Sequence, residues 1–397
     1  MMKRNTLIVS LLLLFVAMFA TDTFAQRAQI DASDRYRWRF DSRIQFDAAI
    51  YNDDKNPLGT NFYNRRLVFR YTGDLGPERA WRARLDMDIA GAEFDMRDFW
   101  IRYNHPGTNF YIKYGYFKPY NHQQTNVGHA RPRYDFMERA VPQTFGDSRH
   151  MGLNFKYYQD QYSGNLGFFT QQPGDPRELG EEKVGLGIYG RITVAPILQD
   201  DKWFHLGVGA NRRTPDAFSG NTVRFRERAE TRVGIGRVYN TGRIPGVDNF
   251  VRVNFEANFN YRTILLVGEY NRAMVNRDGF EDLSFHGGYA SIMWAITGEG
   301  RSYASDDGEP DRLDAPIRSW GALSAGIRYS FLDLNDEDIE GGSGNHITIG
   351  LTYYPQRNVW IQWNVGIADL DEFADGDGDY IGGDAFQFLQ MRVGAWF

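Results

Sequence analysis

The most regular feature of the chain is an alternation of side-chain character over residues 35–50. The positions of one parity are apolar: Tyr36, Trp38, Phe40, Ile44, Phe46, Ala48 and Ile50. The positions of the other parity are mostly charged or polar: Arg35, Arg37, Arg39, Asp41, Arg43, Gln45 and Asp47. Successive side chains of a β-strand point to opposite sides. The pattern therefore predicts a long strand with one aromatic face and one arginine-rich face.

The arginine-rich face indicates which side of the strand contacts water and which side contacts lipid. An arginine on the lipid face of a barrel costs roughly 2–4 kcal/mol near the middle of the membrane, so four would cost on the order of 10 kcal/mol. We therefore expect the arginines to face water inside a barrel and the aromatic side chains to face lipid.

Similar alternation recurs along the rest of the chain without a sustained helical period. The segments are separated by clusters of Gly, Asn, Asp and Pro, and they number about sixteen. The clearest are residues 81–89, 109–116, 150–157, 185–194, 251–260, 284–297, 319–331, 346–354 and 358–368. This predicts an all-β fold: one transmembrane antiparallel β-barrel of about 16 strands over residues 35–397.

The connections predict which end of the barrel is which. The short connection at residues 354–358 is typical of a periplasmic turn, whereas longer acidic stretches are typical of extracellular loops. Three such stretches occur, at residues 305–314, 335–344 and 371–384. The terminal Phe397, on an outward-facing strand, is similar to the signal by which outer-membrane barrels are recognised for assembly.

The N-terminus predicts export. Residues 1–25 combine Lys3 and Arg4, an apolar run at 7–20 and a small-x-small site ending at Ala25, which indicates a cleaved signal peptide. The run is shorter than the ~20 residues of a membrane-spanning helix, which disfavours the alternative of an uncleaved anchor. Residues 26–34 are then a short N-terminal segment, and the expected location is the bacterial outer membrane.

Composition narrows the function classes. There is no cysteine, which excludes a lipidated N-terminal Cys and a disulfide scaffold. Aromatic residues at 15% and 42 glycines suit a barrel with aromatic girdles and many tight turns. The net charge of −6 without a basic tail gives no reason to expect nucleic acid. The histidines lack metal-ligand spacing, so no metal or cofactor is predicted.

A second arginine row carries the candidate chemistry. It consists of four arginines of one parity: Arg224, Arg226, Arg228 and Arg232. Alternate residues of a strand are about 6.8 Å apart, so an anion could pass from one guanidinium to the next. Rows of Arg and Lys favour anions in pores when binding is weak and multi-site.

The alternative for lumen arginines is that they pair with lumen carboxylates and brace the wall. We favour bracing for Arg82 and Arg84, and the pore function for the row, which faces only Glu230 within its own parity. Glu227, on the opposite parity, indicates that this stretch is a loop or folded segment rather than a lipid-facing strand.

Several stretches in order carry a family resemblance: residues 43–51, the pair Arg65-Arg66, 113–120, 136–139, 224–232, 296–303, 321–336 and 347–364. Together they resemble the phosphate-selective porin O and P family over nearly the whole mature length. The resemblance implies a sixteen-stranded homotrimeric barrel, narrowed by an inward-folded constriction loop and lined by an arginine ladder that passes anions.

By this resemblance, Arg65 or Arg66 and the row at 224–232 fall on ladder positions, and the constriction loop lies between Tyr120 and Phe136. The sequence departs from phosphate-specific members because this loop has no lysine. The candidates to replace the lysines are His122, His129, Arg131 and Arg133. A broader anion channel is therefore the expectation, with Glu138 and Arg139 as a structural pair that pins the loop.

The sequence leads to one main hypothesis and two rivals. The main hypothesis is passive diffusion of small, phosphate-like anions through a pore lined by arginines: Arg37, Arg39, Arg43, Arg65, Arg66, Arg131, Arg133, Arg224, Arg226, Arg228 and Arg232. The first rival is a non-selective or cation-favouring pore, which the acidic loops support. The second is a barrel adhesin, receptor or surface enzyme.

Two motifs tempt other interpretations. Gly146-Asp147-Ser148 with His150 is similar to a fragment of a hydrolase site, but no orienting group or oxyanion hole accompanies it. Asp375, Asp377 and Asp379 are similar to a calcium loop, but the required glycine and terminal Glu are absent. A solvated acidic loop is favoured, with divalent-cation bridging to lipopolysaccharide as an alternative.

Overall fold

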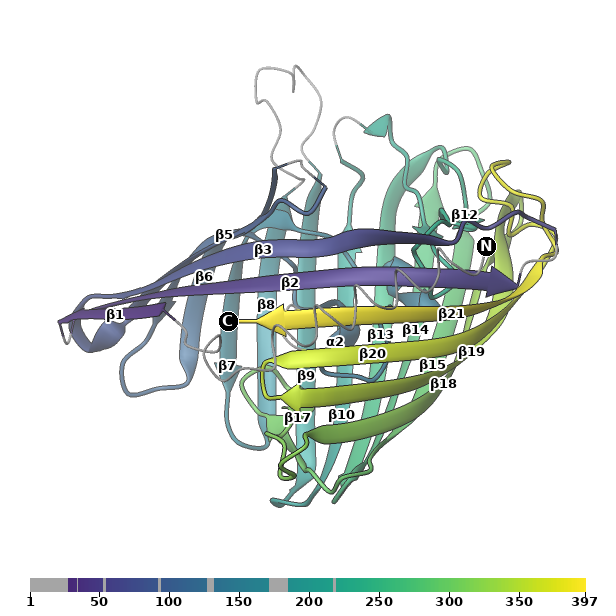
Figure 1. Ribbon diagram of the computed structural model, residues 1–397. Helices are drawn as coiled ribbons and strands as arrows, with labels where there is room; N and C mark the ends of the chain where they lie inside the picture. The colour runs from purple at the N-terminus through teal and green to yellow at the C-terminus, as the bar shows by residue number, and fades with distance from the viewer. Residues whose placement is uncertain are drawn as a thin grey trace.

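The alternating segments form the strands of one closed antiparallel sheet in the computed structural model, which describes residues 28–33, 35–52, 55–91, 94–126, 132–170, 185–216 and 219–397 (Figure 1). The sixteen barrel strands are β2 Tyr36–Asn52, β3 Asn61–Leu75, β4 Trp81–Asp88, β5 Asp95–Asn104, β6 Phe110–Phe117, β7 His150–Tyr158, β8 Tyr162–Thr170, β9 Leu186–Leu198, β10 Lys202–Arg213, β13 Val247–Tyr261, β14 Ile264–Arg277, β15 Leu283–Ala295, β18 Ala322–Asp336, β19 Ile339–Gln356, β20 Val359–Leu370 and β21 Ala385–Trp396. The predicted fold class and strand number are confirmed.

Closure of the barrel comes from pairing between its first and last strands. β2 pairs with β21 from Arg43 opposite Trp396 to Asn52 opposite Gln387, and every other barrel strand pairs with its neighbours along the chain. A closed sheet has no edge, so all backbone groups are satisfied within lipid. None of the helices in the described residues is long and apolar enough to cross a membrane.

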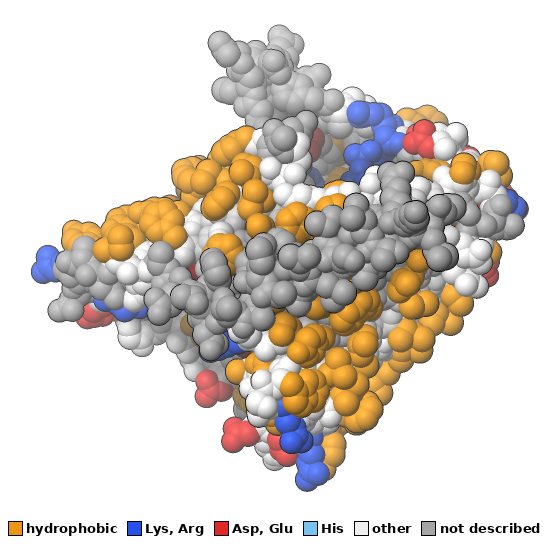
Figure 2. All heavy atoms as spheres, viewed as in Figure 1, with side chains coloured by type: hydrophobic (Ala, Val, Ile, Leu, Met, Phe, Trp, Pro, Cys, Tyr) orange, Lys and Arg blue, Asp and Glu red, His pale blue; other side chains and the backbone are white. Residues whose placement is uncertain are grey.

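The two faces of the wall have the polarity that the sequence predicts. On β2, Phe40 is 51% exposed and points outward, whereas Asp47 is 1% exposed and points into the lumen. Figure 2 shows the outer surface over β18 to β20 covered with hydrophobic side chains. The lipid-facing and water-facing sides are therefore assigned as expected, with the arginines inside.

The ends of the barrel differ in the length of their connections. One end has the C-terminus and short turns such as 159–161, 199–201 and 357–358, and the other has long loops such as 118–149 and 214–246. Short turns mark the periplasmic end and longer loops the extracellular end. The predicted periplasmic turn at 354–358 and the extracellular loop at 371–384 lie at the expected ends.

Two of the loop predictions need correction. Residues 335–344 lie at the predicted extracellular end, but they belong mostly to the hairpin of β18 and β19, with only Glu337 and Asp338 between the strands. Residues 305–314 lie at the periplasmic end, in a hairpin of β16 (Arg301–Ala304) and β17 (Glu309–Leu313). An acidic, glycine-rich composition indicates contact with water, but it does not tell which end of a barrel the segment occupies.

Three segments fold into the barrel from its ends, and we name them here. The first inner loop is 118–149, with α2 (Gln123–Asn126) and η3 (Val141–Phe145). The second inner loop is 214–246, with the two-residue strands β11 (Arg226–Glu227) and β12 (Tyr239–Asn240). The periplasmic hairpin is 296–321. The first inner loop is thus longer than the predicted 120–136.

Apolar side chains hold the two inner loops together inside the barrel. Phe145 of the first loop stacks edge-on against Phe225 of the second, which also contacts Phe250 and Phe285 of the wall. These residues belong to one buried cluster that includes Tyr239 and Phe388. The described parts of the loops are therefore packed against the wall.

The short N-terminal segment contains one further strand. Residues Ala28–Ser33 form β1, an extra strand that pairs with the periplasmic end of β2, beyond the part of β2 that pairs with β21. The short helix η2 (Pro77–Arg79) lies in the turn between β3 and β4. The proposed signal peptide at 1–25 and the candidates His129 and Arg131 lie outside the described residues.

Candidate functional site

Lumen carboxylates on β3 and β4 are each shared by two arginines. Asp74 binds Arg39 at 3.0 Å and Arg82 at 2.5 Å. Asp86 binds Arg70 at 2.9 Å and Arg84 at 2.8 Å. The bracing role predicted for Arg82 and Arg84 is confirmed. Each pair of guanidinium groups nevertheless exceeds the charge of its single carboxylate.

The same arrangement recurs one step further along β4. Asp88 binds Arg66 of β3 at 2.7 Å and Arg97 of β5 at 2.8 Å. Asp86 and Asp88 are two residues apart, so these groups repeat about every 6.8 Å along the strand. The lumen wall of β2–β5, which we call the arginine wall, thus presents a series of levels at which two cations share one anion.

A β-bulge brings both arginines of the pair 65–66 into the lumen. Gln45 pairs with Arg66, whereas the next residue, Phe46, pairs with Asn64, so Arg65 is the extra residue of β3. A bulge leaves one residue unpaired and redirects side chains. Arg65 consequently reaches Asp47 and Glu138 inside the barrel, while Arg66 reaches Asp88. The sequence had left open which of the two would point inward.

The other predicted positions on β2 also face the lumen. Arg37 and Arg39 lie near its periplasmic end, opposite Asp74 and Thr72 of β3. Arg43 lies deeper, close enough to Arg65, Arg70 and Arg97 for electrostatic repulsion. The guanidinium groups of this wall are therefore neighbours of one another and not isolated ion pairs.

Four more cations complete this region: Arg97, Lys118, Arg139 and Arg149. Sequence reasoning had selected only Arg139 among them, and only as a structural partner of Glu138. Arg149 binds Asp98 of β5 at 2.5 Å. Burial, with repulsion from Arg139, Arg149 and Arg97, lowers the pKa of Lys118 well below its usual range. Alternation along β5 could not predict that Arg97 faces the lumen, because the register of β4 and β5 shifts between Leu85 and Met87.

Glu138 joins the arginine wall to the second inner loop. Its carboxylate lies 2.8 Å from Arg392 of β21, 3.3 Å from Arg232 and 3.6 Å from Arg65. Burial would raise the pKa of Glu138, but these arginines lower it well below its usual range. Glu138 thus ties the first inner loop to the wall and to the second inner loop through these three arginines, whereas the prediction had named Arg139 as its partner.

The predicted row on the second inner loop lies at the extracellular end of the lumen. Arg224 donates to Asn240 at 2.7 Å and binds Asp377 at 3.2 Å, and Arg228 donates to the Ile235 carbonyl at 3.3 Å. Burial and repulsion by Arg224, Arg228 and Arg243 lower the pKa of Arg226. The stretch is a folded loop, as Glu227 indicated.

The remaining candidates of the first inner loop do not join this file of cations. Arg133 is 2% exposed and its guanidinium binds Glu309 of the periplasmic hairpin. His122 is 1% exposed, and burial lowers its pKa to about 3. The structure thus places both as buried residues, which corrects the expectation that they replace constriction lysines.

The side chains of the hydrolase-like motif at 146–150 and of the calcium-loop-like motif at 375–379 have partners within the structure. Asp147 binds Arg252 and accepts a hydrogen bond from Tyr189, while Arg213 contacts His150 at 3.0 Å. In the acidic loop, Asp375 accepts hydrogen bonds from the backbone of Asp377 and Gly378, and Asp377 binds Arg224. Among the described residues, no group of three or more metal-ligating side chains is close enough to hold an ion.

Comparisons with known proteins bear on the family and the fold. A family model described as phosphate-selective porin O and P matches residues 39–382. A protein of Caulobacter vibrioides, itself uncharacterised, is 26% identical over 380 residues, which are 90% of this chain and 74% of that protein.

Solved outer-membrane barrels share the fold. An anion-selective porin from Comamonas acidovorans is 14% identical, with a TM-score of 0.57 over 91% of this chain and 100% of that one. The trimer form of OmpT, an outer-membrane protein of Vibrio cholerae, is 11% identical, with a TM-score of 0.57 over 92% and 100% of the two chains.

Proposed function

Because the chain belongs to the phosphate-selective porin O and P family, we propose that it is a passive channel for small anions, with phosphate and related oxyanions as the first candidates. The fold and the family place the protein in the bacterial outer membrane as a porin. Its described lumen offers charged guanidinium groups to a passing anion, both on the wall and on the second inner loop.

The observation that carries the proposal is the sharing of one carboxylate by two arginines at successive levels of the arginine wall. Asp74, Asp86 and Asp88 each hold two guanidinium groups. At each of these carboxylates the bound guanidinium groups outnumber the anion two to one, and the arginines stay fixed in place. An anion then meets several moderate sites in sequence, and weak multi-site binding allows it to leave.

The second inner loop would extend this file to the extracellular mouth. Arg232 and Arg65 bind the same Glu138 carboxylate, at 3.3 and 3.6 Å, so the loop row and the wall meet there. Arginine favours planar or tetrahedral oxyanions, because its fork of donors fits two oxygens at once. This supports oxyanions ahead of halides as preferred solutes.

Reversal potentials in planar bilayers test the proposal directly. With a potassium chloride gradient across a membrane that holds the purified protein, we expect a reversal potential with the same sign as the equilibrium potential of chloride. Cation preference at neutral pH would contradict the proposal and support the rival that the acidic loops favour. A barrel that folds but carries no current would instead point to an adhesin, receptor or surface enzyme.

Variants of the loop row locate the selectivity. Replacing Arg226 and Arg228 with alanine should reduce the anion-to-cation permeability ratio. The matched control is Arg262→Ala, a largely exposed arginine in the turn between β13 and β14 that binds Asp201 at 3.7 Å. An unchanged ratio in the double variant would assign the row to bracing.

Assembly belongs to the same proposal. OmpT has been solved as a trimer, and the family resemblance implies three chains, so we propose a homotrimer in which each barrel conducts separately. On native electrophoresis we expect the mass of a trimer. In planar bilayers we expect the current to change in three equal steps as the three barrels open or close. The extracellular acidic loop would face lipopolysaccharide, with divalent cations between the two, and chelation should then lower the thermal stability of the membrane-bound trimer.

A further inference from the structure

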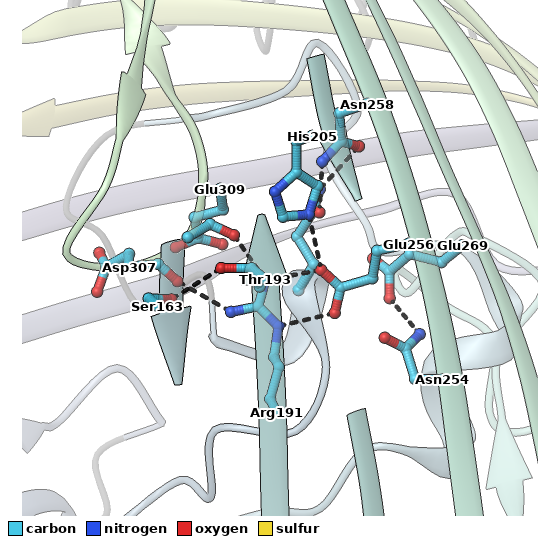
Figure 3. Close-up of polar contacts among 12 residues, drawn as sticks. Ser163, Arg191, Thr193, His205, Asn254, Glu256, Asn258, Glu269, Asp307 and Glu309 are labelled. Carbon is cyan, nitrogen blue, oxygen red and sulfur yellow. Dashed lines mark hydrogen bonds and ion pairs between the residues drawn. The ribbon is translucent and has the colours of Figure 1, made fainter. Parts of the chain in front are cut away.

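The periplasmic hairpin is built into the lumen and not left in solution. It connects β15 to β18 at the end where the other turns are short, and its tip returns to the inner faces of β8 and β9 (Figure 3). Arg191 of β9 donates to the carbonyl of Asp307 at 2.9 Å and to the carbonyl of Gly308 at 2.7 Å. One guanidinium group therefore holds two backbone carbonyls of the tip.

The tip fits closely against the wall at this point. Gly308 has a φ of +67°, and a Cβ added there would lie 2.7 Å from Ser163 Oγ and would also meet Thr193. Ser163 and Thr193 hydrogen-bond to each other at 2.8 Å. A side chain at position 308 would thus push the tip off the wall.

Polar contacts hold the rest of the hairpin as well. Tyr303 hydrogen-bonds to His205 at 2.8 Å, the indole of Trp203 donates to the Arg301 carbonyl at 2.9 Å, and Glu309 binds Arg133 of the first inner loop. At the base, by contrast, Leu313 packs in an apolar cluster with Ala295, Ala322, Tyr354 and Trp360. The hairpin therefore has an apolar base and a polar tip.

The tip lies near a second group of cations on β5, β7 and β9, which continues around the barrel from the last strand of the arginine wall. Asp306, Asp307 and Glu309 act electrostatically on Lys156 of β7, and Asp306 acts also with Arg102 of β5. With Arg133 and Arg191, these make four cations beneath the hairpin. The hairpin's carboxylates and carbonyl oxygens, together with the Glu256 carboxylate that binds Arg191 at 2.6 Å, occupy the groups that oxyanions would otherwise contact.

We propose that the periplasmic hairpin is a releasable plug, whose tip covers a second oxyanion-binding route formed by Arg102, Arg133, Lys156 and Arg191. The proposal rests on the anion-channel function for its solute but concerns a different part of the lumen. Release would exchange these hydrogen bonds and the Glu309–Arg133 ion pair for contacts with water and mobile ions in the lumen. The apolar base keeps the hairpin attached when the tip leaves.

The experiment displaces the tip without changing any charge. In Gly308→Val, we expect the single-channel conductance to rise about twofold, because more of the lumen cross-section becomes available to ions. The matched control is Gly107→Val, in the turn between β5 and β6. Gly107 also has a positive φ, of +72°, but a Cβ there meets nothing within 4 Å. The control should keep wild-type conductance.

A reversible lock separates displacement from general damage. The chain has no cysteine, so Ser163→Cys with Gly308→Cys introduces a single disulfide candidate at the tip. In this double variant, which keeps all four cations, conductance should be high when reduced, because the side chain at position 308 displaces the tip. It should fall towards the wild-type value when oxidation ties the tip back to β8.

The outcomes are distinct. Unchanged conductance in Gly308→Val, or an elevated value that oxidation leaves unchanged, would overturn the plug. A folded wild-type barrel that prefers cations or carries no current would overturn the anion-channel function instead. An additional phosphate block of the reduced, unlocked channel, absent in the locked one, is the result expected if the uncovered cations bind oxyanions.

Discussion

Two walls of the same barrel use their inward positions in different ways. On the arginine wall, Arg65, Arg66 and Arg97 keep between 13 and 23% of their side chains exposed to the lumen. On β13 and β14, which we call the amide wall, the inward positions are buried beneath loops: Asn254, Glu256, Asn258, Asn260, Glu269 and Asn271. Strand alternation is common to both, so alternation alone does not mark a pore lining.

The amide wall serves as a docking surface for the first inner loop. Gln123 exchanges hydrogen bonds with Asn258 at 2.7 and 3.3 Å, and the backbone N–H of Gln124 donates to Glu269 at 3.1 Å. Amides both donate and accept, so they can satisfy a loop backbone without bringing net charge. The loop is fixed to the amide wall, whereas the arginines of the arginine wall keep part of their side chains exposed to the lumen.

The largest effect should come from the attachment of the second inner loop. Glu230 is 2% exposed and accepts hydrogen bonds from Arg328 at 2.6 Å and Thr348 at 2.6 Å. Removing one partner of a buried ion pair costs about 3–5 kcal/mol. We expect Glu230→Gln to lower the free energy of unfolding by that order in urea titrations in detergent.

The control for this variant lies on the same loop. Glu227 is partly exposed and its carboxylate accepts a hydrogen bond from the backbone of Arg228 at 3.0 Å. Glu227→Gln should cost well under half as much, since no buried ion pair is broken. Equal losses in the two variants would contradict the assignment of Glu230 as the attachment point.

The next effect separates the two walls by function. Replacing Arg66 and Arg97 together with glutamine leaves Asp88 without its cations, so the anion-to-cation permeability ratio should fall about tenfold or more, the equivalent of about 1.4 kcal/mol. Asn258→Ala on the amide wall should destabilise the fold but leave the ratio unchanged. A ratio that responds to Asn258→Ala and not to the arginines would reverse the comparison.

A smaller effect depends on pH. The pKa of Lys118 lies well below its usual range because of burial and neighbouring arginines. A depressed lysine is neutral above its own pKa and gains its proton as the pH falls. The anion preference should therefore increase as the pH is lowered from alkaline values, and Lys118→Met should remove that dependence. Reversal potentials over a pH series measure it, and a wild-type ratio independent of pH would contradict it.

The sequence predicted the wall better than the contents of the barrel. Alternation over residues 36–50 assigns both faces of β2 correctly, because each residue changes side in a regular strand. The bulge at Arg65 and the register shift between β4 and β5 each break that rule by one residue. Parity therefore could not decide between Arg65 and Arg66, and it gave no reason to select Arg97.

Segments that fold inward were harder still. The hairpin of β16 and β17 has an acidic composition, and a solvated loop at either end would have the same one. Which end it occupies depends on counting every strand before it, so one missed or added strand moves it across the membrane. The burial of Arg133 in an ion pair could not be predicted either, because its partner Glu309 lies 176 positions away in sequence.

The smallest effect tests the bracing arginines of the arginine wall. Arg82 binds Asp74 at 2.5 Å, but its side chain is 34% exposed and Arg39 binds the same carboxylate. Exposed ion pairs contribute about 0–1 kcal/mol, and Arg39 keeps Asp74 neutralised after the change. Arg82→Gln should therefore alter the unfolding free energy by less than about 1 kcal/mol.

The permeability ratio of Arg82→Gln should shift far less than that of the Arg66 and Arg97 double variant, because one cation at the periplasmic end remains. A shift as large as in the double variant would mean that every level of the wall controls selectivity equally, and that the bulge at Arg65 has no special place in it.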